Sequence, residues 1–267
     1  MKDKTIVDYR LQIADCRMRS AVGGRRFAVW CLLLAVGGLF AQPTGEEILR
    51  KLDANAVAGN RIVTAKMIVT GERLERTLEM RSLVQGTDKA FTEFLSPPRD
   101  AGTKMLKLGD ELWTYTPATD RIIKIAGHML RQSVMGSDLS YEDMLEDRKL
   151  QDMYDAEVTG TDTVLDRPCW VVDLTAREED VAYASRRLWV DQERNIALKE
   201  ERFAKSGDLL KTTEVTEIKK LSGRWVATDV VIRDELRRGE GTEFITEDVE
   251  FDASIPDYIF SKASLRE

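Results

Sequence analysis

The side chains that could support catalysis are few in this chain of 267 residues. Its single histidine, His128, stands between a glycine and a methionine. A histidine-dependent catalytic triad or metal site would therefore have to be built on this one residue, and its neighbours offer no ligand spacing. No G-x-S-x-G, Walker loop or G-x-G-x-x-G occurs in the sequence. We therefore expect no catalytic residue, no metal and no cofactor.

Carboxylates are abundant, but the sequence singles out no catalytic pair. Asp138, Glu142 and Asp143 lie close together, yet their spacing does not fit the twelve-residue calcium loop. Acidic residues at the start of a short helix explain this cluster better. Acid–base catalysis by two carboxylates stays an open alternative, but the sequence favours a binding protein over an enzyme.

An apolar run near the N-terminus has the layout of a secretory signal peptide. Residues 27–41 follow Arg25 and Arg26, and their fifteen positions are fewer than the roughly 20 that span a bilayer. We expect cleavage after Ala41, with Met18 as an alternative start of the chain. An uncleaved membrane anchor is the less favoured alternative. The sequence thus predicts export, a signal peptide over residues 1–41 and a single domain over residues 42–267.

Removal of the leader changes the charge and the cysteine content. The remaining chain has 33 basic and 44 acidic side chains, a net charge of −11. Such a surface favours solubility and is repelled by nucleic acid and by anionic lipid head groups. Only Cys169 remains of three cysteines, so no disulfide within the chain is expected. Cys31 begins the apolar run instead of ending it, so we expect no lipid anchor.

The elements that would position any site are one helix and many strands. Thr44 and Glu47 form a capping box before apolar residues at helical spacing. From residue 61 the apolar residues alternate, and turn signals separate the runs. Strands are expected at 61–69, 77–84, 89–95, 103–108, 111–116, 121–126, 154–162, 167–175, 185–191, 196–203, 209–220, 224–233 and 241–251, with a loop over 127–151, a short helix near 140–145 and a helical turn at 256–260.

One helix cannot cover a sheet of this size. Twelve or so strands at roughly 4.8 Å spacing are about 60 Å wide, whereas a helix of about 14 residues is only some 21 Å long. A large antiparallel sheet with one apolar face must split into two layers or curl around its own interior. The sequence therefore predicts a mainly β (α+β) fold with an apolar hollow that helices plug only in part.

The methionines agree with an apolar binding surface. Seven lie beyond the leader, and all of them precede residue 154. Flexible thioethers suit a surface that repacks around varied apolar ligands. Gap filling in an ordinary core is an equally good explanation.

Several segments together resemble the outer-membrane lipoprotein-sorting proteins, relatives of the periplasmic carrier LolA. The most specific is SVMGSDLSYED at residues 133–143. Matching segments lie in the family's order at 94–106, 112–125, 186–212, 223–232 and 251–261. The resemblance covers nearly all of residues 61–261. It implies an open, curved antiparallel half-barrel with short helices as a lid over an apolar cavity.

The resemblance also implies a function. It is that of a non-catalytic periplasmic carrier, which holds the acyl chains of lipoproteins or other lipids for transfer toward the outer membrane. The implied partners are an inner-membrane transporter and an outer-membrane acceptor, with only transient membrane contact and no nucleic acid. The alternative is a regulatory or adaptor protein of the same fold that senses lipoproteins or docks on a resistance-nodulation-type transporter. An enzyme acting on lipids ranks third.

Alternation along the strands selects the residues expected to contact cargo. The cavity candidates are Val63, Met67, Val69, Leu78, Met80, Leu106, Leu108, Trp113, Ile123, Leu188, Val190, Val230 and Ile232. The lid candidates are Ile48, Leu52, Leu139, Met144 and Leu145. For each single position, packing in an ordinary core is the alternative.

Residues 133–143 have both a structural and a functional interpretation. Ser137 or Ser140 is expected to cap the short helix, with Glu142 and Asp143 in its first turn. The functional alternative is a gating loop that moves when cargo enters.

Overall fold

The computed structural model describes residues 42–56, 59–71, 75–145, 148–179 and 181–267. The predicted signal peptide, residues 1–41, lies outside the described residues. The helices are α1 (Gly45–Ala56), η1 (Gly127–Arg131), η2 (Val134–Gly136), α2 (Tyr141–Leu145), α3 (Leu150–Met153) and η3 (Asp257–Ile259).

The strands alternate with short turns, as the sequence predicts. They are β1 (Asn60–Thr70), β2 (Glu75–Gln85), β3 (Lys89–Ser96), β4 (Lys104–Leu108), β5 (Glu111–Thr116), β6 (Arg121–Ile125), β7 (Tyr154–Val164), β8 (Arg167–Ala176), β9 (Ser185–Asp191), β10 (Ala197–Phe203), β11 (Leu209–Leu221), β12 (Arg224–Asp234) and β13 (Thr242–Phe251).

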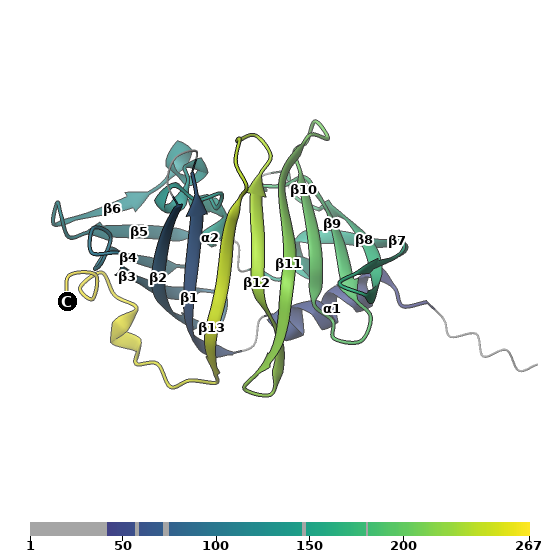
Figure 1. The fold of residues 1–267 in the computed structure, drawn as a ribbon, viewed down its shortest axis with the longest axis horizontal. Coiled ribbons are helices and arrows are strands. Elements are labelled where there is room, and N and C mark those ends of the chain that lie inside the picture. Colours follow the sequence, from purple (N-terminus) through teal and green to yellow (C-terminus); the bar gives the residue numbers. More distant parts are fainter. Residues whose placement is uncertain (1–41, 57–58, 72–74, 146–147, 180) are drawn as a thin grey trace, which may run out of the picture. The chain divides into compact units, whose positions relative to one another are not determined.

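All the described strands form one antiparallel sheet of 13 strands (Figure 1). Its order is β6-β5-β4-β3-β2-β1-β13-β12-β11-β10-β9-β8-β7. The sheet is open and curved and carries a few short helices, which confirms the predicted mainly β half-barrel (Figure 1). The chain starts in the middle of the sheet at β1, proceeds to the β6 edge, and returns to the middle from the β7 edge. The residues between β6 and β7 must therefore connect opposite edges of the sheet, and we call residues 126–153 the crossing segment.

Helix α1 begins with the predicted capping box. The backbone N–H of Glu47 donates to Thr44 Oγ1 at 3.2 Å, and the N–H of Thr44 donates to Glu47 Oε2 at 3.2 Å. The buried face of the helix packs in a core, the helix cluster, that also contains residues of β7, β8 and β9. Its buried members are Ile48, Leu49, Leu52, Met153, Tyr154, Val172, Leu174, Leu188 and Val190. Helix α1 therefore packs mainly on the β7–β9 end of the sheet.

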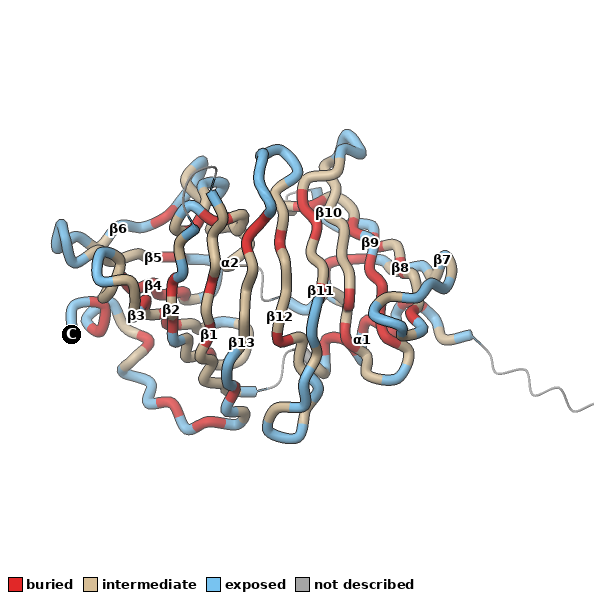
Figure 2. Tube along the Cα trace, in the orientation of Figure 1, coloured by how far each residue is buried: buried red, intermediate tan, exposed pale blue. Residues whose placement is uncertain are grey.

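The crossing segment covers the other end of the same sheet face. Val134 is buried, and Met129, Met135 and Met144 pack beside it, on a second core built by β1 to β6. This core also contains Met67, Met80 and Met105, so we call it the methionine cluster. It brings together six of the seven methionines beyond residue 41, which the sequence distributes over 78 positions from 67 to 144. Buried positions are found at both ends of the sheet (Figure 2).

The C-terminal segment covers part of the opposite face. Adjacent residues of a strand point to opposite faces, so Leu106 faces away from the methionine cluster that contains its neighbour Met105. On that second face, residues of β3, β4 and β5 pack against the chain after β13. The buried members of this tail cluster are Phe91, Leu106, Trp113, Ala253, Ile255, Phe260 and Leu265.

None of the helices in the described parts of the chain is both long enough and apolar enough to cross a membrane.

The tail cluster predicts that the C-terminal segment stabilises the domain. Leu265 is fully buried, whereas Tyr258 in the same segment is 68% exposed. Leu265→Ala should lower the free energy of unfolding by about 2–5 kcal/mol, because it removes buried methyl groups and leaves a cavity. Tyr258→Ala should change it by less than about 0.5 kcal/mol. Urea unfolding of both variants measures the difference, and equal effects would show that the segment is not part of the core.

Candidate functional site

The face of the sheet covered by α1 and the crossing segment gathers most of the predicted cavity and lid residues. Five cavity candidates lie in or against the methionine cluster, together with three lid candidates from the crossing segment. They are Val63, Met67, Val69, Leu78 and Met80, with Leu139, Met144 and Leu145. We call this the inner face.

The other half of the inner face holds four more candidates. Leu188 and Val190 of β9 are buried against Ile48 and Leu52 of α1 in the helix cluster. The predicted lid therefore has two parts, since α1 covers the β7–β9 end and the crossing segment covers the β1–β6 end. The structure places these residues together, while their contact with cargo stays a prediction.

Three candidates do not lie on the inner face. Leu106, Leu108 and Trp113 belong to the tail cluster, beneath Phe260 and Leu265. Leu106 is directly opposite Trp113 in the register of β4 and β5, so these two side chains share the outer face. Their assignment to the inner face of the sheet is therefore wrong. The physical reason is that β4 and β5 carry apolar residues on both faces, and the C-terminal segment covers the second one.

The remaining three candidates lie outside the helix and methionine clusters, although the register of β12, β13 and β1 places Val230 and Ile232 on the inner face. Ile123 is on the edge strand β6 and is 44% exposed. Val230 of β12 packs against a further core that contains Leu198 and Val215. Ile232 is buried on the same strand, opposite Thr242 of β13.

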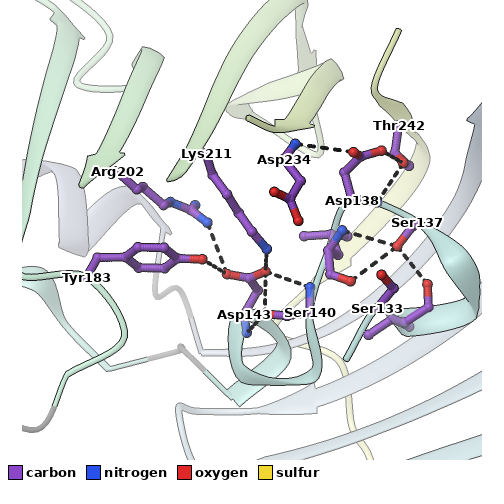
Figure 3. A network of polar contacts seen from close by, with 12 residues as sticks. Ser133, Ser137, Asp138, Ser140, Asp143, Tyr183, Arg202, Lys211, Asp234 and Thr242 are labelled. Carbon is purple, nitrogen blue, oxygen red and sulfur yellow. Dashed lines mark hydrogen bonds and ion pairs between the residues drawn. The ribbon is translucent and has the colours of Figure 1, made fainter. Parts of the chain in front are cut away.

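Polar contacts fix the position of the crossing segment on the inner face (Figure 3). Asp138 accepts a hydrogen bond from Thr242 Oγ1 at 2.6 Å, and its own N–H donates to the same oxygen at 2.9 Å. Its second carboxylate oxygen accepts the backbone N–H of Asp234 at 3.2 Å. Arg237, in the loop after β12, donates to Ser133 Oγ at 3.0 Å. The crossing segment is thus tied to β12, β13 and the loop between them.

A buried charged network joins α2 to strands β9, β10 and β11. Asp143 of α2 accepts a hydrogen bond from Tyr183 Oη at 2.6 Å and forms ion pairs with Arg202 of β10 and Lys211 of β11 (Figure 3). Arg202 also pairs with Glu200 at 2.8 Å, and Glu200 pairs with Arg186 of β9 at 2.9 Å. We call Asp143, Tyr183, Arg186, Glu200, Arg202 and Lys211 the charged network.

Each charge in this network depends on its partners. Burial by itself raises the pKa of Asp143, but the positive charges of Lys211 and Arg202 outweigh it and lower this pKa from 3.8 to about 2. The positive charges of Arg202 and Arg186 likewise outweigh burial and lower the pKa of Glu200 to about 2. Burial lowers the pKa of Arg186 to about 10 and raises that of Tyr183. At neutral pH the carboxylates of Asp143 and Glu200 are therefore negatively charged, and the guanidinium group of Arg186 is positively charged.

Ser137 and Ser140 make structural hydrogen bonds in the folded chain. Ser140 caps α2, because its Oγ accepts the N–H of Asp143 at 3.2 Å and its own N–H donates to Asp143 Oδ2 at 2.7 Å. Ser137 is buried and donates to the carbonyl of Val134 at 2.7 Å. His128 is exposed in η1. Within the described residues, no three His, Cys, Asp or Glu side chains gather as metal ligands would.

Two adjoining cavities remain open on the inner face. The first, which we call the charged pocket, has a volume of about 350 Å³ and is lined in part by Asp143, Arg186, Glu200 and Arg202. The second, the apolar groove, also has a volume of about 350 Å³ and is lined by Leu52, Asn55, Arg61, Val63, Ile196, Ala197, Trp225, Val226, Ala227, Thr246, Val249 and Phe251. Leu52, Arg61 and Ala197 line both, so the charged pocket opens beside the apolar groove. Such an arrangement can hold an apolar chain and a polar group at the same time.

The charged network was not predicted from the sequence, although a signal for it exists. Arg202 and Arg186 are directly opposite in the register of β9 and β10, and Arg202 is also opposite Lys211. Leu188 and Ala197 lie on the inner face of the same two strands. Alternation therefore predicts apolar residues at the positions of Arg186 and Arg202 as well. Charged residues at inward positions therefore indicate an internal partner, and Asp143 in the most specific segment supplies it.

The comparisons agree with this architecture. A family model described as "-like: Uncharacterized protein" matches residues 86–267. No curated protein matches the chain.

Solved structures with the same fold include three bacterial proteins. A domain assigned as an outer membrane lipoprotein-sorting protein from Vibrio parahaemolyticus has 24% identity and a TM-score of 0.72, with coverage of 84% of this chain and 98% of that one. A DUF1329 family protein from Desulfovibrio piger has 24% identity and a TM-score of 0.73, with coverage of 83% and 97%. A LolA superfamily protein from Nitrosomonas europaea has 23% identity and a TM-score of 0.70, with coverage of 84% and 100%. The predicted resemblance is confirmed at the level of the fold.

The charged network predicts a specific dependence of stability on pH. Asp143→Asn should lower the free energy of unfolding at pH 7 by about 3 kcal/mol or more, because it leaves Lys211 buried without its partner. The folded pKa of Asp143 lies below its unfolded value, so its ionisation stabilises the protein above about pH 4, and this contribution of about 2 kcal/mol is lost as the pH falls toward 2. The difference between wild type and variant should therefore shrink by about 2 kcal/mol between pH 5 and pH 2.

Urea unfolding at several pH values measures this effect. Asp173→Asn provides the control, because Asp173 pairs with Arg187 at the surface, and it should cost less than about 1 kcal/mol. A difference between wild type and Asp143→Asn that stays constant over this pH range would contradict the assignment.

Proposed function

The chain belongs to the family whose model matches residues 86–267, and it has the fold of the LolA superfamily. From these two findings we propose that it is a carrier. The proposed activity is to hold the acyl chains of a lipoprotein or another lipid in a hydrophobic cavity on the inner face. No bond is made or broken in this activity. The contacts of the charged network and of the cap of α2 support this proposal, because they account for polar side chains of the crossing segment as structural residues.

The observation that carries this proposal is the apolar groove between the helix cluster and the methionine cluster. It is bounded by Leu52 of α1, Val63 of β1 and Trp225 of β12. An acyl chain in water costs about 0.8 kcal/mol for each exposed CH₂ group, so a chain gains by entering such a groove. Longer or additional chains could bind where the crossing segment now packs, since its methionines make flexible apolar contacts.

The proposed location is the periplasm, after cleavage of residues 1–41 as a signal peptide. In that compartment a carrier would receive cargo from an inner-membrane transporter and deliver it to an outer-membrane acceptor. Hand-over needs no chemical step, because an acceptor with a better apolar site is sufficient to draw the chain out.

Lipid extraction from the native protein tests the carrier function. The protein, purified from the periplasm without detergent, should contain an acyl-bearing species at close to one molecule per chain, as measured by mass spectrometry. An adaptor that only docks on a transporter should contain none. Protein that stays empty, and that takes up no lipid when incubated with it, would overturn the carrier proposal.

A substitution that fills the apolar groove should separate binding from folding. Ala227 lines the groove and is half-buried. Ala227→Trp should occupy this space and weaken the binding of a fluorescent fatty acid at least tenfold. The melting temperature should change little, because the groove is open. Ala118→Trp, in the exposed turn between β5 and β6, adds the same side chain elsewhere and serves as the control. Equal binding by both variants would place the cargo outside the groove.

A further inference from the structure

Arg61 stands out among the charged residues of the inner face. It lies on β1, where Arg61, Val63 and Ala65 alternate on one face, and its side chain is half-buried. Its guanidinium group has no hydrogen bond or ion pair with any residue in the described ranges. A guanidinium group has five N–H donors, and in Arg61 they have no acceptor among the described residues. A ligand could provide this partner.

The acidic residues near Arg61 are already engaged elsewhere. Three carboxylates line the charged pocket with it. Asp53 accepts the backbone N–H groups of Leu150 at 3.1 Å and Gln151 at 3.0 Å. Asp143 and Glu200 are paired within the charged network. The pocket therefore presents an arginine whose counter-ion is not supplied by its acidic lining residues.

The place of Arg61 indicates what kind of anion would bind. It lines both the charged pocket and the apolar groove, as do Leu52 and Ala197. An anion at the guanidinium would thus have an apolar channel on one side, bordered by Val63 and Trp225. A small hydrophilic anion would use only the charged part of this site, whereas an amphiphile would use both.

We infer that Arg61 binds the anionic head group of an amphiphile whose acyl chain lies in the apolar groove. The inference rests on the proposed carrier function and specifies its cargo as a lipid with a small acidic head, such as a carboxylate. The planar guanidinium can donate two parallel hydrogen bonds to such a group. Selection between charged and neutral lipids would then take place at this one side chain.

Competition with a neutral fluorescent dye tests the inference. Laurate and dodecanol have the same apolar chain and differ in the charge of the head, and inorganic phosphate provides an anion without a chain. Each is titrated against wild-type protein loaded with N-phenylnaphthylamine, and then against Arg61→Gln. Arg81→Gln is the matched control, because Arg81 is exposed on the neighbouring strand β2 and, next to Met80, points to the opposite face.

Laurate should bind Arg61→Gln about 10- to 100-fold more weakly than wild type, as expected for the loss of a charged hydrogen-bonded pair. Dodecanol should bind both proteins with affinities within about twofold, and Arg81→Gln should resemble wild type. A thermal melt of each variant verifies that it is folded.

The other outcomes separate the two proposals. If both amphiphiles displace the dye equally well and Arg61→Gln changes neither, the head-group assignment fails while the carrier proposal stands. If Arg61→Gln weakens both equally, Arg61 shapes the groove and does not recognise charge, so the assignment fails again. Phosphate that binds as tightly as laurate, and only when Arg61 is present, would show that the acyl chain adds no affinity and would reassign the site to free anions. If neither amphiphile binds the wild-type protein, the carrier proposal itself fails.

Discussion

The fold depends on the path of the chain through the sheet. The polypeptide starts in the middle at β1, builds one half outward to β6, and must then reach β7 at the opposite edge before it returns to the middle. Because the crossing segment connects opposite edges, it passes over a face of the sheet. This face is the one that carries the methionine cluster. A lid over the inner face is thus a direct consequence of strand order. Because α1 has only 12 residues, about 18 Å of helix, the two covers leave space between them.

The crossing segment is held by two different kinds of interaction. Its apolar residues pack on the methionine cluster, where contacts have little directional preference. Asp138 and Asp143 instead make directional contacts with Thr242 and Lys211 on the central strands. A buried ion pair adds little net stability over an apolar pair of the same size, but loss of one partner is costly. The charged residues therefore define where the segment lies, and the apolar residues provide most of the buried area.

Much of the fold could be predicted from the sequence because the local signals agree with one another. Alternation from residue 61 onward, the capping box at Thr44 and the turn residues together give the helix and all the strands. The faces were harder to assign. Alternation cannot choose a face for β4, since Met105 and Leu106 are both apolar, and only the position of the C-terminal segment decides it. The charged network was missed because Asp143 and Lys211 are 68 residues apart and meet only through the crossing segment.

The apolar and the charged contacts of the crossing segment differ in how much it costs a ligand to displace them. An acyl chain that displaces Met129 or Leu130 exchanges one apolar contact for another, so the free energy changes little. Displacing Asp143 would leave Lys211 buried without its counter-ion, which is far more costly. For a carrier this asymmetry has a consequence. In the proposed function, cargo would enlarge the cavity from the apolar groove toward the methionine cluster while α2 stays anchored at the charged network. The crossing segment would then open at its apolar end without losing its position on the sheet.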